Sequence, residues 1–360
     1  MLNWLLILVP VTVALELLAP DLHTLIFASA GLAIVPLAGW LGRATDQLSR
    51  YTGEGAGALL NAAFGNAAEL IIGAMALREG LYSVVKASIT GSILGNILFV
   101  LGAAAVAGGI RHKEQTFNTT AARSQATLLT LASIAMIMPA AFSALAGPAA
   151  RISEGALSLV ISAVLIVAYG LNLLFSLYTH RQLFQGAHQP GPADERPWSV
   201  RRSVAVLAGA TALVAWMSEI LVGSVEPAAR ALGMSRIFVG VIIVAIVGNA
   251  AEHSTAVLMA WRNRMELAIG ISIGSSLQIA LFVAPVLVFS SRFLGPRPMD
   301  LVFTPAEVLA VFVAVLITGQ IAADGKSNWI EGVQLLAVYL ILALVFYLLP
   351  EASLEPAAAR

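Results

Sequence analysis

The stretch Gly-Asn-Ala-Ala-Glu occupies residues 65–69, and the same five residues recur at 248–252. The two copies are 183 residues apart, and the same offset aligns 90–94 with 273–277 in the segment that follows. A five-residue identity that includes Asn and Glu is hard to obtain by chance from an apolar composition, so the pattern indicates an internal duplication.

The composition around this repeat excludes a soluble globular domain. Of the 360 residues, 59% are hydrophobic and 11% are charged, against roughly 25% charged in an average soluble protein. Apolar stretches of about 20 residues, each long enough to cross roughly 30 Å of hydrocarbon, recur along the chain. The sequence therefore predicts an all-α polytopic membrane protein, surrounded by a lipid bilayer.

Charge and cysteine content exclude further classes. Lys and Arg number 20, as do Asp and Glu, so there is no basic surface for nucleic acid. The chain has no cysteine, which excludes disulfides, thiolate metal sites and cysteine nucleophiles. No catalytic residues and no bound cofactor are expected.

The apolar blocks predict eleven transmembrane helices, near 3–19, 22–41, 54–78, 82–108, 118–145, 152–178, 203–224, 235–261, 265–290, 304–322 and 328–349. The first block lacks the basic start and cleavage site of a signal peptide, so a span is preferred to a cleaved signal. We expect five parts, an additional helix in 1–20, a first five-helix repeat in 21–180, a cytoplasmic linker in 181–200, a second repeat in 201–350 and a tail in 351–360.

Five helices per repeat mean that the second copy enters the membrane from the opposite side. Inverted repeats of this kind are typical of secondary transporters, whose ion sites lie near the bilayer midplane. Lys and Arg divide twelve against eight between the two sides, which predicts a cytoplasmic N-terminus by the positive-inside rule. A location in a prokaryotic cytoplasmic membrane is expected.

Two carboxylates are predicted near the middle of the membrane. Glu69 and Glu252 end the two motifs, and no Lys or Arg lies within two turns of Glu69. An uncompensated carboxylate in the bilayer costs several kcal/mol, so an intramembrane acid is a functional candidate by default. A misplaced helix end or a structural ion pair is the alternative, but it leaves the duplication unexplained.

Other oxygen-bearing residues accompany these acids. Each asparagine lies three residues before its glutamate and therefore on the same helical face. The predicted metal-binding set is Glu69, Glu252, Asn66, Asn249, Ser92, Ser275, Gln278 and Asn96. For the two serines, close helix packing through neighbouring Gly-x-x-x-Gly patterns is an equal alternative.

Oxygen-only ligands favour a hard cation, and two carboxylates balance a divalent charge. Ca²⁺ is the first candidate, with Mn²⁺ or Mg²⁺ behind it. The same acids take up protons when the metal leaves, so one pair can serve Ca²⁺ and H⁺ alternately. Glu219 and His253 are candidates for proton relay or gating, although a packing role explains either residue as well.

At these residues the chain resembles the calcium/proton exchanger family of the cation/calcium antiporter superfamily, in its prokaryotic form. The resemblance rests on 65–69, on 248–253, on Gly-Ser-Ser-Leu-Gln at 274–278 and on 324–332. It implies eleven helices, a cytoplasmic linker and Ca²⁺ extrusion in exchange for protons. The linker departs from the family, because it has only Asp194 and Glu195 where an acidic helix is common.

Three other functions compete with this interpretation. A Na⁺-coupled exchanger of the same superfamily fits the same motif, and a cation channel also uses polar residues at the midplane. Nucleotide-driven transport is disfavoured, because Gln320 stands where a phosphate-binding loop requires glycine.

Overall fold

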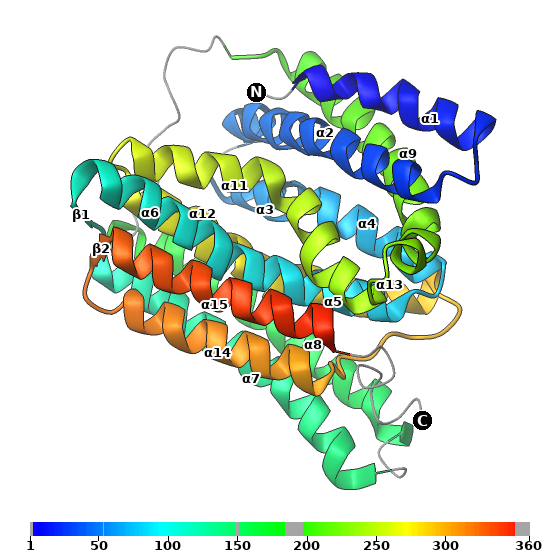
Figure 1. Cartoon of the computed structure of the whole chain (residues 1–360). Helices are drawn as coiled ribbons and strands as arrows, with labels where there is room; N and C mark the ends of the chain where they lie inside the picture. The colour runs from blue at the N-terminus through cyan, green and yellow to red at the C-terminus, as the bar shows by residue number, and fades with distance from the viewer. Residues whose placement is uncertain (1–2, 53, 148–150, 184–196, 350–360) are drawn as a thin grey trace.

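A computed structural model describes residues 3–52, 54–147, 151–183 and 197–349. Most of the predicted linker 181–200 and the predicted tail 351–360 lie outside the described residues. Figure 1 shows long helices packed side by side, with α1, α2 and α9 along one edge and α7, α14 and α15 along the other.

The first part of the described chain is helical apart from one short strand. Its helices are η1 (Asn3–Ile7), α1 (Leu8–Leu18), α2 (His23–Thr52), α3 (Glu54–Gly65), α4 (Ala67–Arg78), α5 (Tyr82–Leu94), η2 (Gly95–Val100), α6 (Leu101–His112), α7 (Thr119–Ala146), α8 (Arg151–Leu174) and η4 (Phe175–Thr179). η1 is a 3₁₀-helix, while η2 and η4 are π-helical turns.

The second part of the described chain is also helical apart from one short strand. Its helices are η5 (Arg181–Leu183), α9 (Val200–Ala231), α10 (Arg236–Phe238), η6 (Val239–Val244), α11 (Ala245–Trp261), α12 (Met265–Gln278), η7 (Ile279–Val283), α13 (Ala284–Leu294), α14 (Pro305–Ile321) and α15 (Trp329–Leu348). η6 and η7 are π-helical turns that continue into the neighbouring α-helices.

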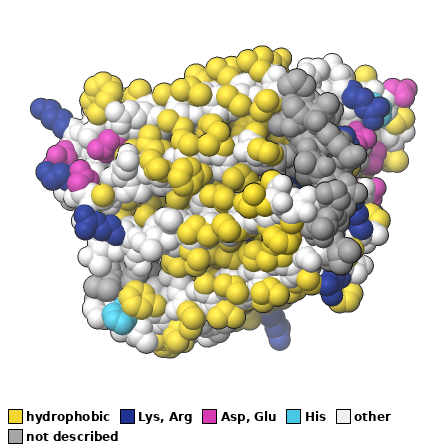
Figure 2. Space-filling view, turned by 90° about the horizontal axis from the view of Figure 1, so that it is seen from below, with side chains coloured by type: hydrophobic (Ala, Val, Ile, Leu, Met, Phe, Trp, Pro, Cys, Tyr) yellow, Lys and Arg dark blue, Asp and Glu magenta, His cyan; other side chains and the backbone are white. Residues whose placement is uncertain are grey.

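Among the described residues, eight continuous helical stretches are long and apolar enough to cross a membrane, and two shorter apolar stretches cover Asn3–Leu18 and Pro305–Ile321. Every range predicted to be helical contains helix, within several residues at the ends. Figure 2 shows why the outer surface suits lipid, since apolar side chains cover the middle of this face while most charged side chains gather near two opposite edges.

The prediction of one continuous helix over 54–78 was wrong. Asn66 leaves the helical conformation, with φ −104° and ψ 28°, and separates α3 from α4. Its side chain makes hydrogen bonds to α12 instead of pointing along its own helix. The break thus falls inside the duplicated motif, where the apolar pattern gives no sign of it.

The prediction of an entirely helical chain also missed a small sheet. β1 (Glu114–Thr116) pairs antiparallel with β2 (Lys326–Asn328), with Gln115 opposite Ser327. Both segments are short polar loops at the same end of the bundle, where neither continues an apolar helix pattern. Asn328 then caps α15 in a capping box with Glu331. We call this end of the molecule the sheet end.

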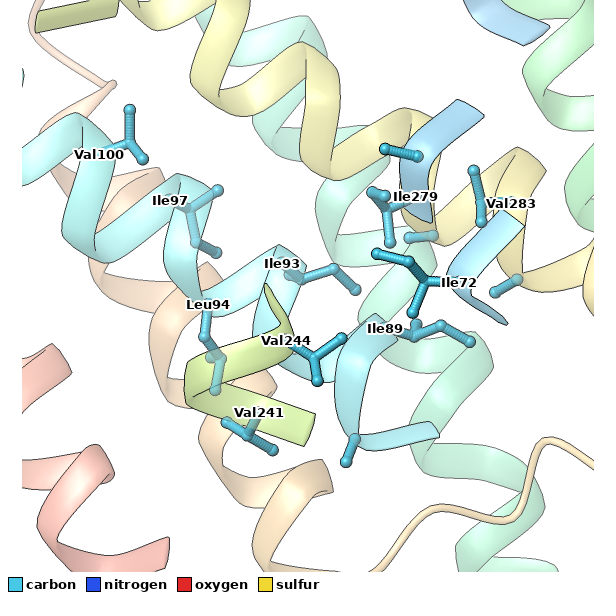
Figure 3. Close-up of a cluster of buried hydrophobic side chains, with 14 of the residues drawn as sticks. Ile72, Ile89, Ile93, Leu94, Ile97, Val100, Val241, Val244, Ile279 and Val283 are labelled. Carbon is cyan, nitrogen blue, oxygen red and sulfur yellow. The ribbon is translucent and has the colours of Figure 1, made fainter. Parts of the chain in front are cut away.

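The core lies around α5 and η2, where side chains are buried on nearly every face. Figure 3 shows Ile89, Ile93 and Leu94 of α5 among Val241 and Val244 of η6 and Ile279 of η7. α5 also meets α12, where Ser276 Oγ donates a hydrogen bond to Ile93 O at 3.4 Å. These two central helices carry the polar residues of the duplicated segments.

Candidate cation site between the two halves

Asn66 binds to the second half of the chain through its side-chain amide. Its Oδ1 accepts a hydrogen bond from Ser275 Oγ at 3.2 Å, and its Nδ2 donates to Gln278 Oε1. Both partners lie on α12, one turn apart. Because Asn66 is fully buried, these bonds satisfy polar groups that would otherwise be costly in the core.

Asn249 makes the corresponding contacts to the first half. Its Nδ2 donates to Ser92 Oγ at 2.9 Å, and its Oδ1 accepts from Asn96 Nδ2 at 3.2 Å. Its Nδ2 also donates to Ala245 O of its own helix at 2.9 Å, and α11 is continuous at this position. Each motif asparagine therefore binds a serine and a second amide side chain from the opposite half.

The two glutamates lie beside these amides. Glu69 packs over Gly248, where a methyl group added to the glycine would fall 3.3 Å from Glu69 Cγ. Glu252 lies one turn further along α11, close to Ser275 and close enough to Glu69 for the two carboxylates to interact. Its Oε2 is buried and has no hydrogen-bond partner among the described residues.

This arrangement offers oxygen atoms and two negative charges in a small volume. Like charges held together in a medium of low dielectric repel strongly unless a cation or a proton lies between them. Carboxylate, amide and hydroxyl oxygens are the ligands that Ca²⁺ accepts. The site can therefore hold a divalent cation, and it can hold protons when the cation is absent.

All eight residues predicted to bind metal lie in or beside this cluster. The two residues predicted to relay protons, Glu219 and His253, have other contacts. Glu219 is half exposed and forms an ion pair with Arg78 at 2.6 Å, so it contacts neither site glutamate. His253 packs edge-on against Phe99, with ring centroids 5.9 Å apart, and its buried Nε2 has no partner among the described residues.

Two neighbours of the cluster were not predicted. Asn61 lies one turn before Gly65, and its Oδ1 shares the space beside Gly65 with Gln278 Oε1, at 3.6 and 3.8 Å from an added methyl group. Tyr169 of α8 lies beside Gln278. Asn61 was detectable as an isolated amide in an apolar helix, whereas only the fold brings Tyr169 here.

A second buried polar group lies at the opposite end of α5. Lys86 Nζ binds Asp300 Oδ1 at 2.5 Å and Val302 O at 2.8 Å. Glu307 is buried in the first turn of α14, where Thr304 caps the helix and Thr90 donates to Glu307 Oε1 at 3.3 Å. These contacts join α5 to the loop before α14, at what we call the far end.

The fold and this cluster define a polytopic helical membrane protein with an acidic, oxygen-rich site between two halves of its chain. The family model for the sodium/calcium exchanger protein matches residues 22–178 and 202–348. The chain therefore belongs to the sodium/calcium exchanger family, a family of transporters rather than enzymes.

Curated relatives agree with this assignment. The chain is 46% identical over 349 residues to the Ca(2+)/H(+) antiporter ChaA of Bacillus subtilis, covering 95% of this chain and 98% of the relative. It is 45% identical over 342 residues to a Ca(2+)/H(+) antiporter of Aphanothece halophytica, covering 90% of each.

Solved structures share the fold. The structure of native YfkE matches with a TM-score of 0.81 at 43% identity, covering 96% of this chain and all of the other. The H+/Ca2+ exchanger CAX matches with a TM-score of 0.70, covering 96% of this chain and 91% of the other, at 16% identity, a likeness of fold alone.

Proposed function

We propose that this protein exchanges Ca²⁺ for protons, with Glu69 and Glu252 as the shared binding groups. The observation that carries the proposal is that Glu69 packs against Gly248, one turn before Glu252, inside an apolar bundle. Two facing acids need either one divalent cation or protons, which is the alternation that an antiporter requires. The relatives named as Ca(2+)/H(+) antiporters support the choice of ions.

The remaining oxygens complete the proposed Ca²⁺ site. Ser92, Ser275 and the amide oxygens of Asn66 and Asn249 lie around the acids and can replace part of the hydration shell. Asn96 and Gln278 hold the two asparagines in place. Mn²⁺ accepts similar ligands, so transport of Mn²⁺ is an expected secondary activity.

The proposed architecture is an inverted repeat of two five-helix units after one additional helix. Two reciprocal bonds support it, because Asn66 binds Ser275 and Asn249 binds Ser92. The 183-residue offset makes Asn66 equivalent to Asn249 and Ser92 equivalent to Ser275. The contact of Ser276 with Ile93, two positions 183 residues apart, supports a pseudo-two-fold axis between α5 and α12. Such an arrangement permits alternating access to one central site.

In the proposed cycle the sheet end faces the cytoplasm, as the distribution of Lys and Arg predicts. Ca²⁺ enters from that side and binds the deprotonated acids. Rearrangement of the two halves opens the far end, where protons displace Ca²⁺. The protonated acids then return, so that downhill proton entry drives Ca²⁺ out of the cytoplasm.

Transport by reconstituted vesicles tests this function. A pH gradient should drive Ca²⁺ uptake by the wild-type protein, and Glu69→Gln or Glu252→Gln should abolish it. Glu16→Gln is a matched control, because Glu16 is exposed on α1. Full activity in either site variant would refute the two-glutamate mechanism.

The same vesicles separate the alternative functions. A Na⁺-coupled exchanger, which the family model also covers, would move Ca²⁺ on a Na⁺ gradient at uniform pH. A channel would pass Ca²⁺ without any counter-ion gradient and would give single-channel currents. Strict dependence on a proton gradient would exclude both alternatives.

A further inference from the structure

Two tyrosines pack against the π-helical turns that follow the site residues. Tyr169 of α8 lies against Phe282 of η7, with ring centroids 5.8 Å apart and ring planes tilted by 36°. Tyr339 of α15 lies against Phe99 of η2, at 5.3 Å and the same 36°. The 183-residue offset makes Phe99 equivalent to Phe282. The fold thus makes one aromatic contact twice, each time between the two halves of the chain.

The hydroxyl groups of both tyrosines are buried without a partner. Tyr169 is 5% exposed and Tyr339 is 9% exposed, and neither hydroxyl has a hydrogen-bond partner among the described residues. A buried polar group without a partner is unfavourable. A phenylalanine ring would make the same aromatic contact without this cost, so packing alone gives no reason for the hydroxyl groups.

The surroundings of the two hydroxyls differ at the position one turn before each phenylalanine. In the second half this residue is Gln278, which lies beside Tyr169. In the first half the equivalent residue is Gly95, which has no side chain. The hydroxyl of Tyr169 therefore lies next to an amide of the candidate site, whereas Tyr339 meets no counterpart of that amide.

Gln278 lies between Asn66 and Tyr169 along α12 and η7. Asn66 binds Gln278 and also Ser275, which lies one turn earlier. Tyr169 contacts Gln278 and also Phe282, which lies one turn later. One amide side chain thus connects a site residue of the first half with a tyrosine of α8.

The orientation of the Gln278 amide matters to the site. Its Oε1 accepts a hydrogen bond from Asn66 Nδ2, and Asn66 Oδ1 is one of the proposed Ca²⁺ ligands. A half-turn of the Gln278 amide would exchange its Oε1 and Nε2, so that two donors would face each other. Asn66 would then have to turn its own oxygen away from the cation. An acceptor for Gln278 Nε2 prevents this half-turn, and Tyr169 brings an oxygen atom to the same amide.

We propose that Tyr169 is a positioning residue that fixes the orientation of the Gln278 amide and, through it, that of Asn66. With Ca²⁺ bound, Gln278 Nε2 donates a hydrogen bond to Tyr169 Oη, which keeps Gln278 Oε1 toward Asn66. The tyrosine itself does not touch the cation. The inference rests on the proposed function and deepens it, because it adds a residue of α8 to the support of the Ca²⁺ site.

Tyr169→Phe tests this role, because it removes the hydroxyl and keeps the ring. Isothermal titration of the purified protein should show an affinity for Ca²⁺ lower by about threefold to tenfold, the effect of one hydrogen bond. The unfolding temperature without Ca²⁺ should not fall, because the hydroxyl has no partner among the described residues. A merely structural role predicts the opposite pattern, a loss of stability at unchanged affinity, and that result would overturn the inference.

Tyr339→Phe is the matched control. It removes a hydroxyl of similar burial from the equivalent aromatic contact, where Gly95 stands in place of Gln278. We expect this variant to bind Ca²⁺ like the wild-type protein. An equal loss of affinity in both variants would overturn the inference, because the loss would then come from aromatic packing and not from the amide.

A double-mutant cycle tests whether Tyr169 acts through Gln278. Gln278→Met keeps an unbranched side chain of similar length and removes the amide, so no orientation is left to fix. Adding Tyr169→Phe to Gln278→Met should change the affinity for Ca²⁺ by less than about twofold. If Gln278→Met does not fold, Gln278→Ala takes its place in the cycle. A further loss of about threefold or more in these backgrounds would overturn the inference.

These titrations separate the inference from the proposed function. Binding of Ca²⁺ is measured without a proton gradient, so a wild-type protein that binds Ca²⁺ but does not exchange it for protons would refute only the proposed exchange. Equal affinity of Tyr169→Phe and the wild-type protein would overturn only the inference.

Discussion

Glu69 of the first motif lies directly over Gly248 of the second, with room for a hydrogen atom but little for a methyl group. A methyl group there would lie 3.3 Å from Cγ and 3.4 Å from Oε1 of Glu69. Gly248 therefore sets the position of Glu69. The glycine of the first copy has different neighbours, because a methyl group on Gly65 would lie 3.6 Å from Asn61 Oδ1 and 3.8 Å from Gln278 Oε1.

Gly248→Ala should weaken Ca²⁺ binding by about threefold to tenfold, because Glu69 must move by a few tenths of an ångström. Gly248→Val should weaken it further. Isothermal titration of the purified protein with Ca²⁺ measures the change, and Gly209→Ala serves as the control. Unchanged affinity in Gly248→Val would mean that Glu69 does not bind the ion from this position.

Asn249→Ala should destabilise the fold as well as the site. It leaves Asn96 Nδ2 and Ser92 Oγ without their partner in the core, and an unsatisfied buried polar group costs about 1–3 kcal/mol. Thermal unfolding in detergent measures the loss. Asn61→Ala removes an exposed amide and should unfold like the wild-type protein. Equal stability of the two variants would contradict this account.

Gly91→Ala should disrupt the crossing of α5 and η6. The added methyl group overlaps the backbone of Val241, which cannot rotate away as a flexible side chain does. We expect a lower unfolding temperature and a lower yield of folded protein than for Gly209→Ala, whose methyl group has open space. Normal stability of Gly91→Ala would show that the two helices separate at little cost.

The affinity for Ca²⁺ should fall as the pH falls, since protons and Ca²⁺ compete for Glu69 and Glu252. Each displaced proton changes the dissociation constant by about tenfold per pH unit in the range where the acids titrate. Titrations in buffers of different ionisation enthalpy count the protons released. Binding that is independent of pH in Glu16→Gln and in the wild-type protein alike would exclude direct competition.

The helices and the cluster were accessible from the sequence because both depend on local patterns. Apolar blocks between charged breaks gave the helical ranges, and a repeated motif with Asn and Glu indicated the residues that meet. The partners within the cluster depend instead on how α12 and α5 cross. No sequence pattern shows that Asn66 binds Gln278 or that Tyr169 lies nearby.

Glu219 shows that the position of an acid along an apolar helix does not by itself identify a site residue. Its position well inside a long apolar helix suggested a role at the site, but the structure pairs it with Arg78 at the end of α4. That pairing joins residues 141 positions apart, so the charge pattern along α9 does not reveal it. The break at Asn66 escaped prediction for a related reason, because its compensating hydrogen bonds come from a distant helix.

The small sheet joins the two halves of the chain at one corner of the bundle. β1 follows α6 and β2 precedes α15, so backbone hydrogen bonds join the loop 113–118 to the loop 322–328. Lys326 adds an ion pair to Glu114 at 3.0 Å. If the sheet end widens during transport, we expect this corner to stay joined and the opening to form on the side of α2 and α3, which carries no such strand pairing among the described residues.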